Sequence, residues 1–305
     1  MLLEPAHPAH QLLAFNAGPE PNYLSHILLA GLLTVAPPWL AEKFLLTLYV
    51  SGLPIALRYA LRATHQHKAG WLALLGFPLI YSVVLIWGFY NFCLSLIVLL
   101  VALGYWQRHT GRWRFPAGLG LAGLLTLLYA AHPMSYLVSG LLLGLLLVTT
   151  NWGSGPLLIR ELKTVFLAYL PTLPLMSWYL WQQGAATSQP TEQYGENLWN
   201  WLRLEPIHYV GSAEGTYRWL VAALLAGALG LMFRQVLRGS KAGWQVLPWA
   251  LGVCLLVGAY VAMPDGVAGG SSNLPTLGTT QLFCAARGAS RSALACSVAL
   301  VRDCP

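Results

Sequence analysis

Apolar runs of similar length recur along most of the chain and are separated by short polar segments. A helix that crosses a membrane needs roughly 20 mainly apolar residues, because the hydrocarbon core is about 30 Å thick. The pattern predicts an all-α fold, a polytopic integral membrane helical bundle within residues 41–263. We expect about eight transmembrane helices, near residues 42–62, 70–88, 90–106, 115–131, 133–150, 164–182, 217–236 and 244–263.

A shorter apolar segment, NYLSHILLAGLLTVAPPWL, covers residues 22–40. It begins with polar residues and ends at Pro37 and Pro38. We therefore interpret residues 23–40 as an interfacial or re-entrant helix, with a ninth span as the alternative. Residues 1–22 then form an outer N-terminal segment.

Basic residues lie at every second boundary between the expected spans. Short loops rich in Lys and Arg stay in the cytoplasm, so these boundaries indicate the inner side. They carry Arg58, Arg62, Lys68, Arg108, Arg112, Arg114, Arg160, Lys163, Arg234, Arg238 and Lys241. The opposite boundaries carry Glu4, Glu20, Glu42, Glu192, Glu196, Glu205, Glu214 and Asp265. The alternation predicts a multi-pass protein of the cell inner (plasma) membrane, with both chain ends and the polar loop 184–216 outside.

The composition agrees with a lipid environment. Hydrophobic residues make up 57% of the 305 positions and charged residues only 9%, whereas soluble domains carry about 25% charged residues. The net charge of +7 is spread between long apolar runs and forms no contiguous basic patch. We therefore expect the lipid bilayer as a partner and no nucleic acid.

Polar residues that are far apart in the sequence are expected to meet on the outer side. The set comprises Glu20, Asn22, His26, Tyr90, Asn91, His132, His208, Glu214 and Asp265. Asn22 and His26 are four residues apart, which places them on one helical face. Carboxylates and imidazoles gathered in this way serve as general bases or hold a divalent cation such as Mg²⁺ or Mn²⁺.

Several of these residues also have an ordinary structural explanation. His132 fits a helix end, and Asn91 and Asp265 fit tight turns. Glu20 precedes an expected helix, where the helix dipole favours a carboxylate. The functional interpretation therefore depends on their shared side of the membrane.

Four segments carry a resemblance to a known group of proteins: PEPNYLSHILLAGLLTVAPPWLAEKFLLTLYV, GFYNFCLSL, AAHPMSYLV and MPDGVAGG. Together they resemble bacterial multispanning membrane proteins of the GT-C type, over roughly residues 18–270. Members of that group are glycosyltransferases that take a sugar from a polyprenyl-phosphate carrier, or relatives without a proven activity. The resemblance implies a glycosyltransferase-like protein of the cell envelope that acts on a lipid-linked sugar at the outer face.

The resemblance also implies roles for individual residues. The group places an acidic catalytic residue in the first outer loop, ahead of an interfacial helix, and Glu20 is the residue in the matching position. We expect His26, His132 and Asp265 to support catalysis, and Asn22, Tyr90, Asn91 and His208 to contact the substrate. A carboxylate in this place takes the proton of the acceptor, while a divalent cation or a cationic side chain neutralises the departing phosphate.

The two ends of the chain differ from that group. Its members have a span before the acidic loop and further spans after the last motif, so we expect this chain to be truncated at both ends. The tail 264–305 becomes rich in Ser, Cys and Arg after Gly270. Two hypotheses stand side by side: a shifted reading frame, or an outer tail in which two of its cysteines form a disulfide.

Two other functions are kept as alternatives. A transporter or flippase-like protein requires ionisable residues along a pathway inside the spans, and the expected spans hold no deep acidic residue. A non-catalytic membrane component, or a gene fragment, is the third interpretation.

Overall fold

The computed structural model describes residues 18, 20–65, 73–74, 76–151, 153–183, 214–239 and 241–262. The expected site residues His208 and Asp265, most of the outer loop 184–216 and the tail 264–305 lie outside the described residues. The regular structure within the described residues is helical, without a strand. The expectation of an all-α fold is confirmed to this extent.

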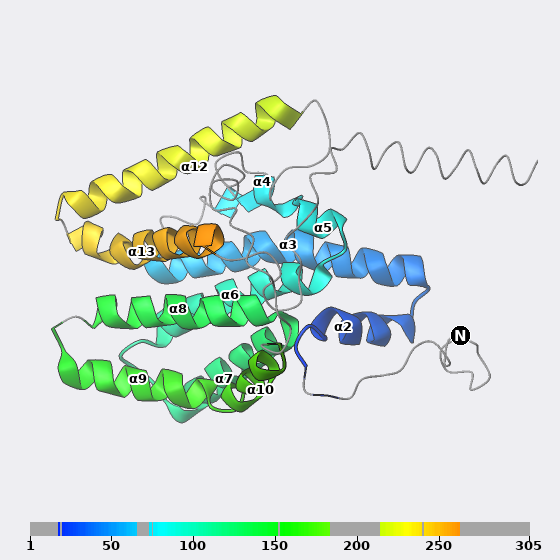
Figure 1. Ribbon diagram of the computed structural model, residues 1–305, viewed down its shortest axis with the longest axis horizontal. Helices are drawn as coiled ribbons and strands as arrows, with labels where there is room; N and C mark the ends of the chain where they lie inside the picture. The colour runs from blue at the N-terminus through cyan, green and yellow to red at the C-terminus, as the bar shows by residue number, and fades with distance from the viewer. Residues whose placement is uncertain are drawn as a thin grey trace, which may run out of the picture.

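The helices stack side by side with their long axes roughly parallel (Figure 1). In chain order they are α2 (Leu24–Leu33), α3 (Pro38–His65), α4 (Phe77–Ile80), α5 (Val83–Ile86), α6 (Tyr90–His109), α7 (Phe115–Ala131), α8 (Pro133–Thr150), α9 (Gly155–Tyr169), α10 (Leu173–Gln183), α12 (Glu214–Leu237) and α13 (Lys241–Ala262).

Among the described residues, three helices are long and apolar enough to cross a membrane: α3, α6 and α8. Shorter apolar stretches of 10–17 residues lie in α2, α7, α12 and α13. Large apolar side chains also remain exposed on the outside of the bundle, among them Ile55, Phe166 and Leu231. Such a surface is suited to lipid contact, because apolar side chains that face hydrocarbon avoid unfavourable contact with water. The described part of the chain is all-helical, and its three long apolar helices indicate a membrane protein.

Two of the expected spans, 115–131 and 133–150, coincide with α7 and α8, and the expected span 90–106 lies within α6. The segment 23–40 is different from the expectation, because its helix α2 ends at Leu33 and Pro38 begins α3. Proline suits the first helical position, since its missing N–H would have no partner there. The two prolines therefore mark the start of the next helix as well as the stop of the previous one.

The expectation of one continuous span over residues 70–88 is wrong. The described part of this segment contains two four-residue helices, α4 and α5, which are separated by a bend at Tyr81 and Ser82. Pro78 cannot continue a helix from the preceding turn, so α4 begins beside it. Gly88 adopts a φ of 77°, a left-handed conformation that turns the chain into α6.

The expected span 164–182 is also wrong, because it is divided between two helices. α9 begins earlier, at Gly155, and ends at Tyr169, while α10 begins at Leu173. Pro171 lies in the break, where it has no N–H to donate and its ring would clash with the carbonyl one turn earlier. The Tyr169 carbonyl at this break accepts hydrogen bonds from the Thr172 backbone N–H at 2.9 Å and from the Thr172 hydroxyl at 3.0 Å.

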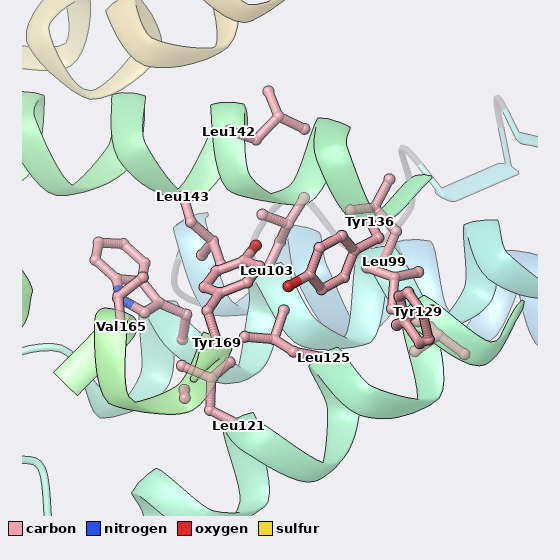
Figure 2. Close-up of a cluster of buried hydrophobic side chains, with 14 of the residues drawn as sticks. Leu99, Leu103, Leu121, Leu125, Tyr129, Tyr136, Leu142, Leu143, Val165 and Tyr169 are labelled. Atoms are coloured by element: carbon pink, nitrogen blue, oxygen red, sulfur yellow. The ribbon is translucent and has the colours of Figure 1, made fainter. Parts of the chain in front are cut away.

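A core of leucine side chains lies between α6, α7, α8 and α9 (Figure 2). Leu121, Leu125, Leu128 and Leu143 are each 0% exposed. α6 also packs closely against α3 at Gly104, where an added Cβ would lie 2.8 Å from the Tyr59 ring. Small residues let helix backbones approach within a membrane, where dispersion contacts replace the hydrophobic effect as the main attraction.

The alternating helix directions give the bundle two chemically different ends (Figure 1). α3, α6 and α8 begin at one end, which we call the polar end, and α7 and α9 begin at the other, which we call the basic end. Contacts agree with this arrangement, since Tyr90 bonds to Glu42 at the polar end and Arg108 lies over Tyr59 nearer the basic end. The arrangement brings the described members of the predicted outer set to the same end.

The close approach at Gly104 gives a first prediction. Replacing Gly104 with Leu should push α3 away from α6, because the new Cβ would also lie 3.0 Å from the Ala60 Cα. We expect the free energy of unfolding to fall by about 1–3 kcal/mol, measured by thermal unfolding of the protein in detergent micelles. Gly123→Leu in α7 is the matched control, since an added Cβ there meets no atom within 4 Å. Equal unfolding temperatures for the two variants would contradict the packing argument.

Candidate functional site

The side chain of Asn91, in the first turn of α6, holds the beginning of α2. Its Oδ1 accepts a hydrogen bond from the Ser25 backbone N–H at 2.6 Å, and its Nδ2 donates to the Asn22 carbonyl oxygen. The same Nδ2 lies 3.3 Å from Nδ1 of His26. We call Asn22, Ser25, His26 and Asn91 the Asn91 cluster. Its amide acts as a helix cap supplied by another helix, because the first N–H groups of α2 have no acceptor within α2 itself.

The backbone just before α2 is bent into a conformation that few residues adopt. Asn22 has a φ of 71°, in the left-handed region where asparagine is tolerated better than most residues. The N–H of the next residue, Tyr23, donates to the Ala130 carbonyl in the last turn of α7 at 2.8 Å. The segment is therefore fixed to α6 on one side and to α7 on the other.

Glu20 lies two residues before this bend and is exposed. Its negative charge acts on the hydroxyl groups of Tyr129 in α7 and Tyr179 in α10. Both tyrosines are largely buried, with exposed fractions of 4% and 7%. The carboxylate therefore lies at the surface of the polar end, close enough to Tyr129 and Tyr179 for its charge to act on both.

His132 connects α7 to α8 in an extended conformation, with a φ of −162°. Its ring packs edge-on against Phe92, with ring centroids 5.1 Å apart. Its Nδ1 is buried and has no hydrogen-bond partner within the described residues. Burial lowers the pKa of His132 to about 4, so the ring is neutral at pH 7.

The structure thus places six of the eight candidate residues at the polar end, and His208 and Asp265 lie outside the described part. Asn22, His26 and Asn91 are in direct contact. Glu20 and His132 flank this group. Tyr90 instead donates its hydroxyl to Glu42 of α3 at 2.7 Å and ties α3 to α6.

The predicted divalent cation finds no ligand set in the described part of the chain. A metal site needs several donors directed at one point, and no group of three or more His, Cys, Asp or Glu side chains is gathered there. Histidine and asparagine in the Asn91 cluster bond to each other and to the backbone. We therefore derive no chemical step through a metal ion.

Inside the bundle, buried hydroxyl groups form pairs between helices. The hydroxyls of Ser95 and Ser135 are 2.6 Å apart, as are those of Ser139 and Tyr169. The hydroxyls of Tyr136 and Thr172 are 2.8 Å apart. Figure 2 shows Tyr136 and Tyr169 directed into the core from different helices. These hydroxyls satisfy one another, and each such bond contributes about 0.6 kcal/mol on average in membrane proteins.

At the basic end, the structure contains an acidic residue that sequence reasoning did not select. Glu161, in α9, has a side chain that is 0% exposed. It accepts hydrogen bonds from the Gly111 N–H at 2.7 Å and from Nε1 of Trp113 at 2.5 Å. The signal in the sequence was a single carboxylate between two basic neighbours, Arg160 and Lys163. A buried carboxylate is stable only when neighbouring donors form hydrogen bonds with it.

Comparisons with protein-family models, with curated proteins and with solved structures find no match to this chain. Interpretation of the site therefore starts from its own residues and their geometry.

Glu161 gives a second prediction. Replacing it with Ala leaves two donors, the Gly111 N–H and the Trp113 indole, without the oxygens they bond to. Each donor left without an acceptor costs about 1–3 kcal/mol, so the unfolding temperature in detergent should fall clearly. Glu161→Gln keeps one oxygen acceptor and should lose less. Identical unfolding temperatures for Ala, Gln and the unchanged protein would show that these bonds do not stabilise the fold.

His132 gives a third prediction, concerning pH. The pKa of His132 is lowered to about 4 in the folded protein by burial, whereas the unfolded chain has an ordinary value near 6.5. The unfolded state therefore binds the proton first, and stability contributed by this residue should be lost as the pH falls from about 6.5 to about 4. Above pH 6.5 both states are neutral, so no dependence is expected.

The measurement is the unfolding temperature across this pH range for the unchanged protein and for His132→Asn. Asparagine does not titrate and can still accept hydrogen bonds at the start of α8. The difference between the two proteins isolates His132 from other titrating groups. Parallel pH profiles would contradict the prediction.

Proposed function

We propose that this chain is a glycosyltransferase-like protein of the cell envelope, a multi-pass protein of the inner (plasma) membrane that acts on a lipid-linked sugar at the outer face. The proposal keeps about eight crossings, two of which would be made by broken rather than continuous helices. The basic end would face the cytoplasm, because Lys and Arg in short loops are retained there. The polar end, which carries Glu20, would then face outward.

The observation that supports this proposal best is the fixed position of Glu20. An exposed carboxylate lies next to a short apolar helix, α2, and the segment between them is bonded to α6 and α7. A catalytic base must be held within hydrogen-bond reach of the proton that it removes, and at the same time remain accessible to the acceptor. The bonds to α6 and α7 restrain the segment next to Glu20, and the exposure of its carboxylate would leave it open to an acceptor.

The proposed reaction is a displacement at the anomeric carbon of the donor sugar. The acceptor hydroxyl oxygen attacks that carbon, the bond from the carbon to the carrier phosphate oxygen breaks, and the phosphate leaves with the bonding electrons. Glu20 takes the proton from the acceptor hydroxyl. Lys43 is an exposed cation in the first part of α3, with its ammonium 5.2 Å from the centre of the Trp39 ring. It is available at this end to stabilise the negative charge of the departing phosphate.

In this proposal, Asn91 is a positioning residue. Its amide bonds to the Asn22 carbonyl and to the Ser25 N–H, and so fixes the backbone that carries Glu20. His132 supplies a neutral ring beside Phe92, and Phe92 is the residue directly after Asn91 in the sequence. Because this ring is neutral, it carries no charge of its own beside Glu20 and would not oppose proton uptake by that carboxylate.

The buried hydroxyl pairs argue against the transporter alternative. A transport pathway needs polar groups that are open to a passing substrate. The hydroxyls of Ser95, Ser135 and Ser139 are instead bonded to one another or to Tyr169. These bonds account for the polar side chains within the bundle as structural contacts.

The fourth prediction tests the proposed base. Glu20→Gln should lower the rate of sugar transfer by roughly 100-fold or more, because general base catalysis contributes about 10²–10⁴-fold. The assay uses membranes containing the chain, a set of radiolabelled polyprenyl-phosphate sugars as donors, and detection of labelled product that is no longer bound to the carrier.

The matched control is Glu42→Gln, another exposed carboxylate at the polar end, which bonds to Tyr90. It should retain most of the transfer rate. Full transfer by Glu20→Gln would remove Glu20 as the base, and no transfer from any donor by the unchanged protein would remove the glycosyltransferase proposal itself.

A further inference from the structure

Positive charge accumulates at the basic end of the bundle. The described cations near this end are Arg58 and Arg62 of α3, Arg108 of α6, Arg112 and Arg114 of the loop 110–114, Arg160 and Lys163 of α9, Arg234 of α12, and Arg238 in the turn that follows α12. Glu161 is the acid found at this end within the described residues, and its side chain is 0% exposed. The exposed surface here is therefore strongly positive, with no exposed acid among the described residues to balance it.

The loop 110–114 is held at this end of the bundle by bonds to two residues of α9. Glu161 binds the Gly111 N–H and the Trp113 indole from below, as described above. Nη2 of Arg160 donates to the Gly111 carbonyl oxygen at 2.9 Å, although its side chain is still 57% exposed. Gly111 has a φ of 76°, which permits the tight turn between these bonds. Arg112 follows directly in the sequence and is exposed, next to the Gly111 carbonyl that Arg160 binds.

A third arginine is restrained close to this loop. The Arg108 guanidinium lies 4.3 Å from the centre of the Tyr59 ring, a contact between α6 and α3. Such a cation–aromatic contact orients the side chain without neutralising its charge. Arg108, Arg112 and Arg160 thus present positive charge from two helices and the loop between α6 and α7.

The depth of these residues matches the headgroup layer of a bilayer. α6 has 20 residues, which at 1.5 Å per residue gives about 30 Å, the thickness of the hydrocarbon core. The residues that follow α6 therefore lie at the level of lipid phosphates. Trp113 and His109 stack there with ring centroids 5.7 Å apart, and tryptophan is typical of this interface.

We propose that Arg108, Arg112 and Arg160, arranged around the loop 110–114, form a docking surface for the headgroup of an anionic phospholipid of the surrounding bilayer. Guanidinium groups suit this ligand, because their planar donors match phosphate oxygens in pairs. Charge complementarity carries the proposal: positive charge is in excess at the depth where lipid phosphates lie, because Glu161, 4.0 Å from Arg160, is the one acid at this end within the described residues. The docking surface is at the opposite end of the bundle from Glu20, so it stands independently of the proposed sugar transfer.

The test uses the full-length protein in a non-ionic detergent, with phosphatidylglycerol or phosphatidylcholine added. Phosphatidylglycerol should raise the unfolding temperature more than phosphatidylcholine does. Addition of 0.5 M salt should weaken this effect, because salt screens the attraction between exposed charges. Native mass spectrometry should show retained phosphatidylglycerol on the protein. Inorganic phosphate at the same concentration is the arm that distinguishes a free anion from a lipid.

The variants separate a defined docking surface from diffuse attraction. The double variant Arg112→Gln, Arg160→Gln should lose most of the phosphatidylglycerol effect, and Arg112→Gln alone should lose part of it without touching the Arg160 hydrogen bond. The matched control is the double variant Arg234→Gln, Arg238→Gln. It removes two exposed cations at the C-terminal end of α12, which also lies at the basic end, and it should keep the phosphatidylglycerol effect. Equal stabilisation by the two lipids, equal stabilisation by phosphate alone, or an equal loss in the control would overturn the proposal.

Discussion

Hydrocarbon offers no hydrogen-bond partner to a peptide group, so a chain inside a membrane must satisfy its backbone within itself. Helices achieve this along their length, but every break exposes donors and acceptors. In this protein side chains supply partners at several breaks, and two of these side chains come from other helices. Asn91 binds the Ser25 N–H at the start of α2, Glu161 binds the Gly111 N–H after α6, and Thr172 binds a carbonyl at the end of α9. The polar residues of the bundle are largely explained by this requirement.

The same requirement creates the two chemically distinct ends. Breaks at the polar end use an amide and leave the exposed Glu20 carboxylate near buried tyrosines. The break at the basic end uses the buried carboxylate of Glu161. This carboxylate lies 4.0 Å from the guanidinium of Arg160, and the other exposed arginines at this end keep their charge. One end therefore offers an acid–base group to solvent, and the other offers uncompensated positive charge. The proposed sugar chemistry and the proposed lipid contact follow from this difference in how the breaks are satisfied.

Much of the helical framework could be predicted from the sequence, because apolar length alone determines where a helix can cross a bilayer. The bounds of α7 and α8 match the expected ranges. The prediction of continuous spans over residues 70–88 and 164–182 was wrong, because a proline inside an apolar run can either kink a helix or break it. Tertiary partners select between them: at Pro171, the Thr172 hydroxyl and its bond to Tyr136 are available to stabilise the break.

Composition and order along the chain were enough to predict the membrane environment, the helical class and the separation of basic from acidic boundaries. They also indicated that Glu20, Asn22, His26, Asn91 and His132 lie on one side. Which of these residues touch could be seen only in three dimensions, because contacts between α2, α6 and α7 depend on helix rotation, and rotation is set by packing at many positions at once. For the same reason Glu161, one carboxylate among basic neighbours in the sequence, became visible as the centre of the basic end only in three dimensions.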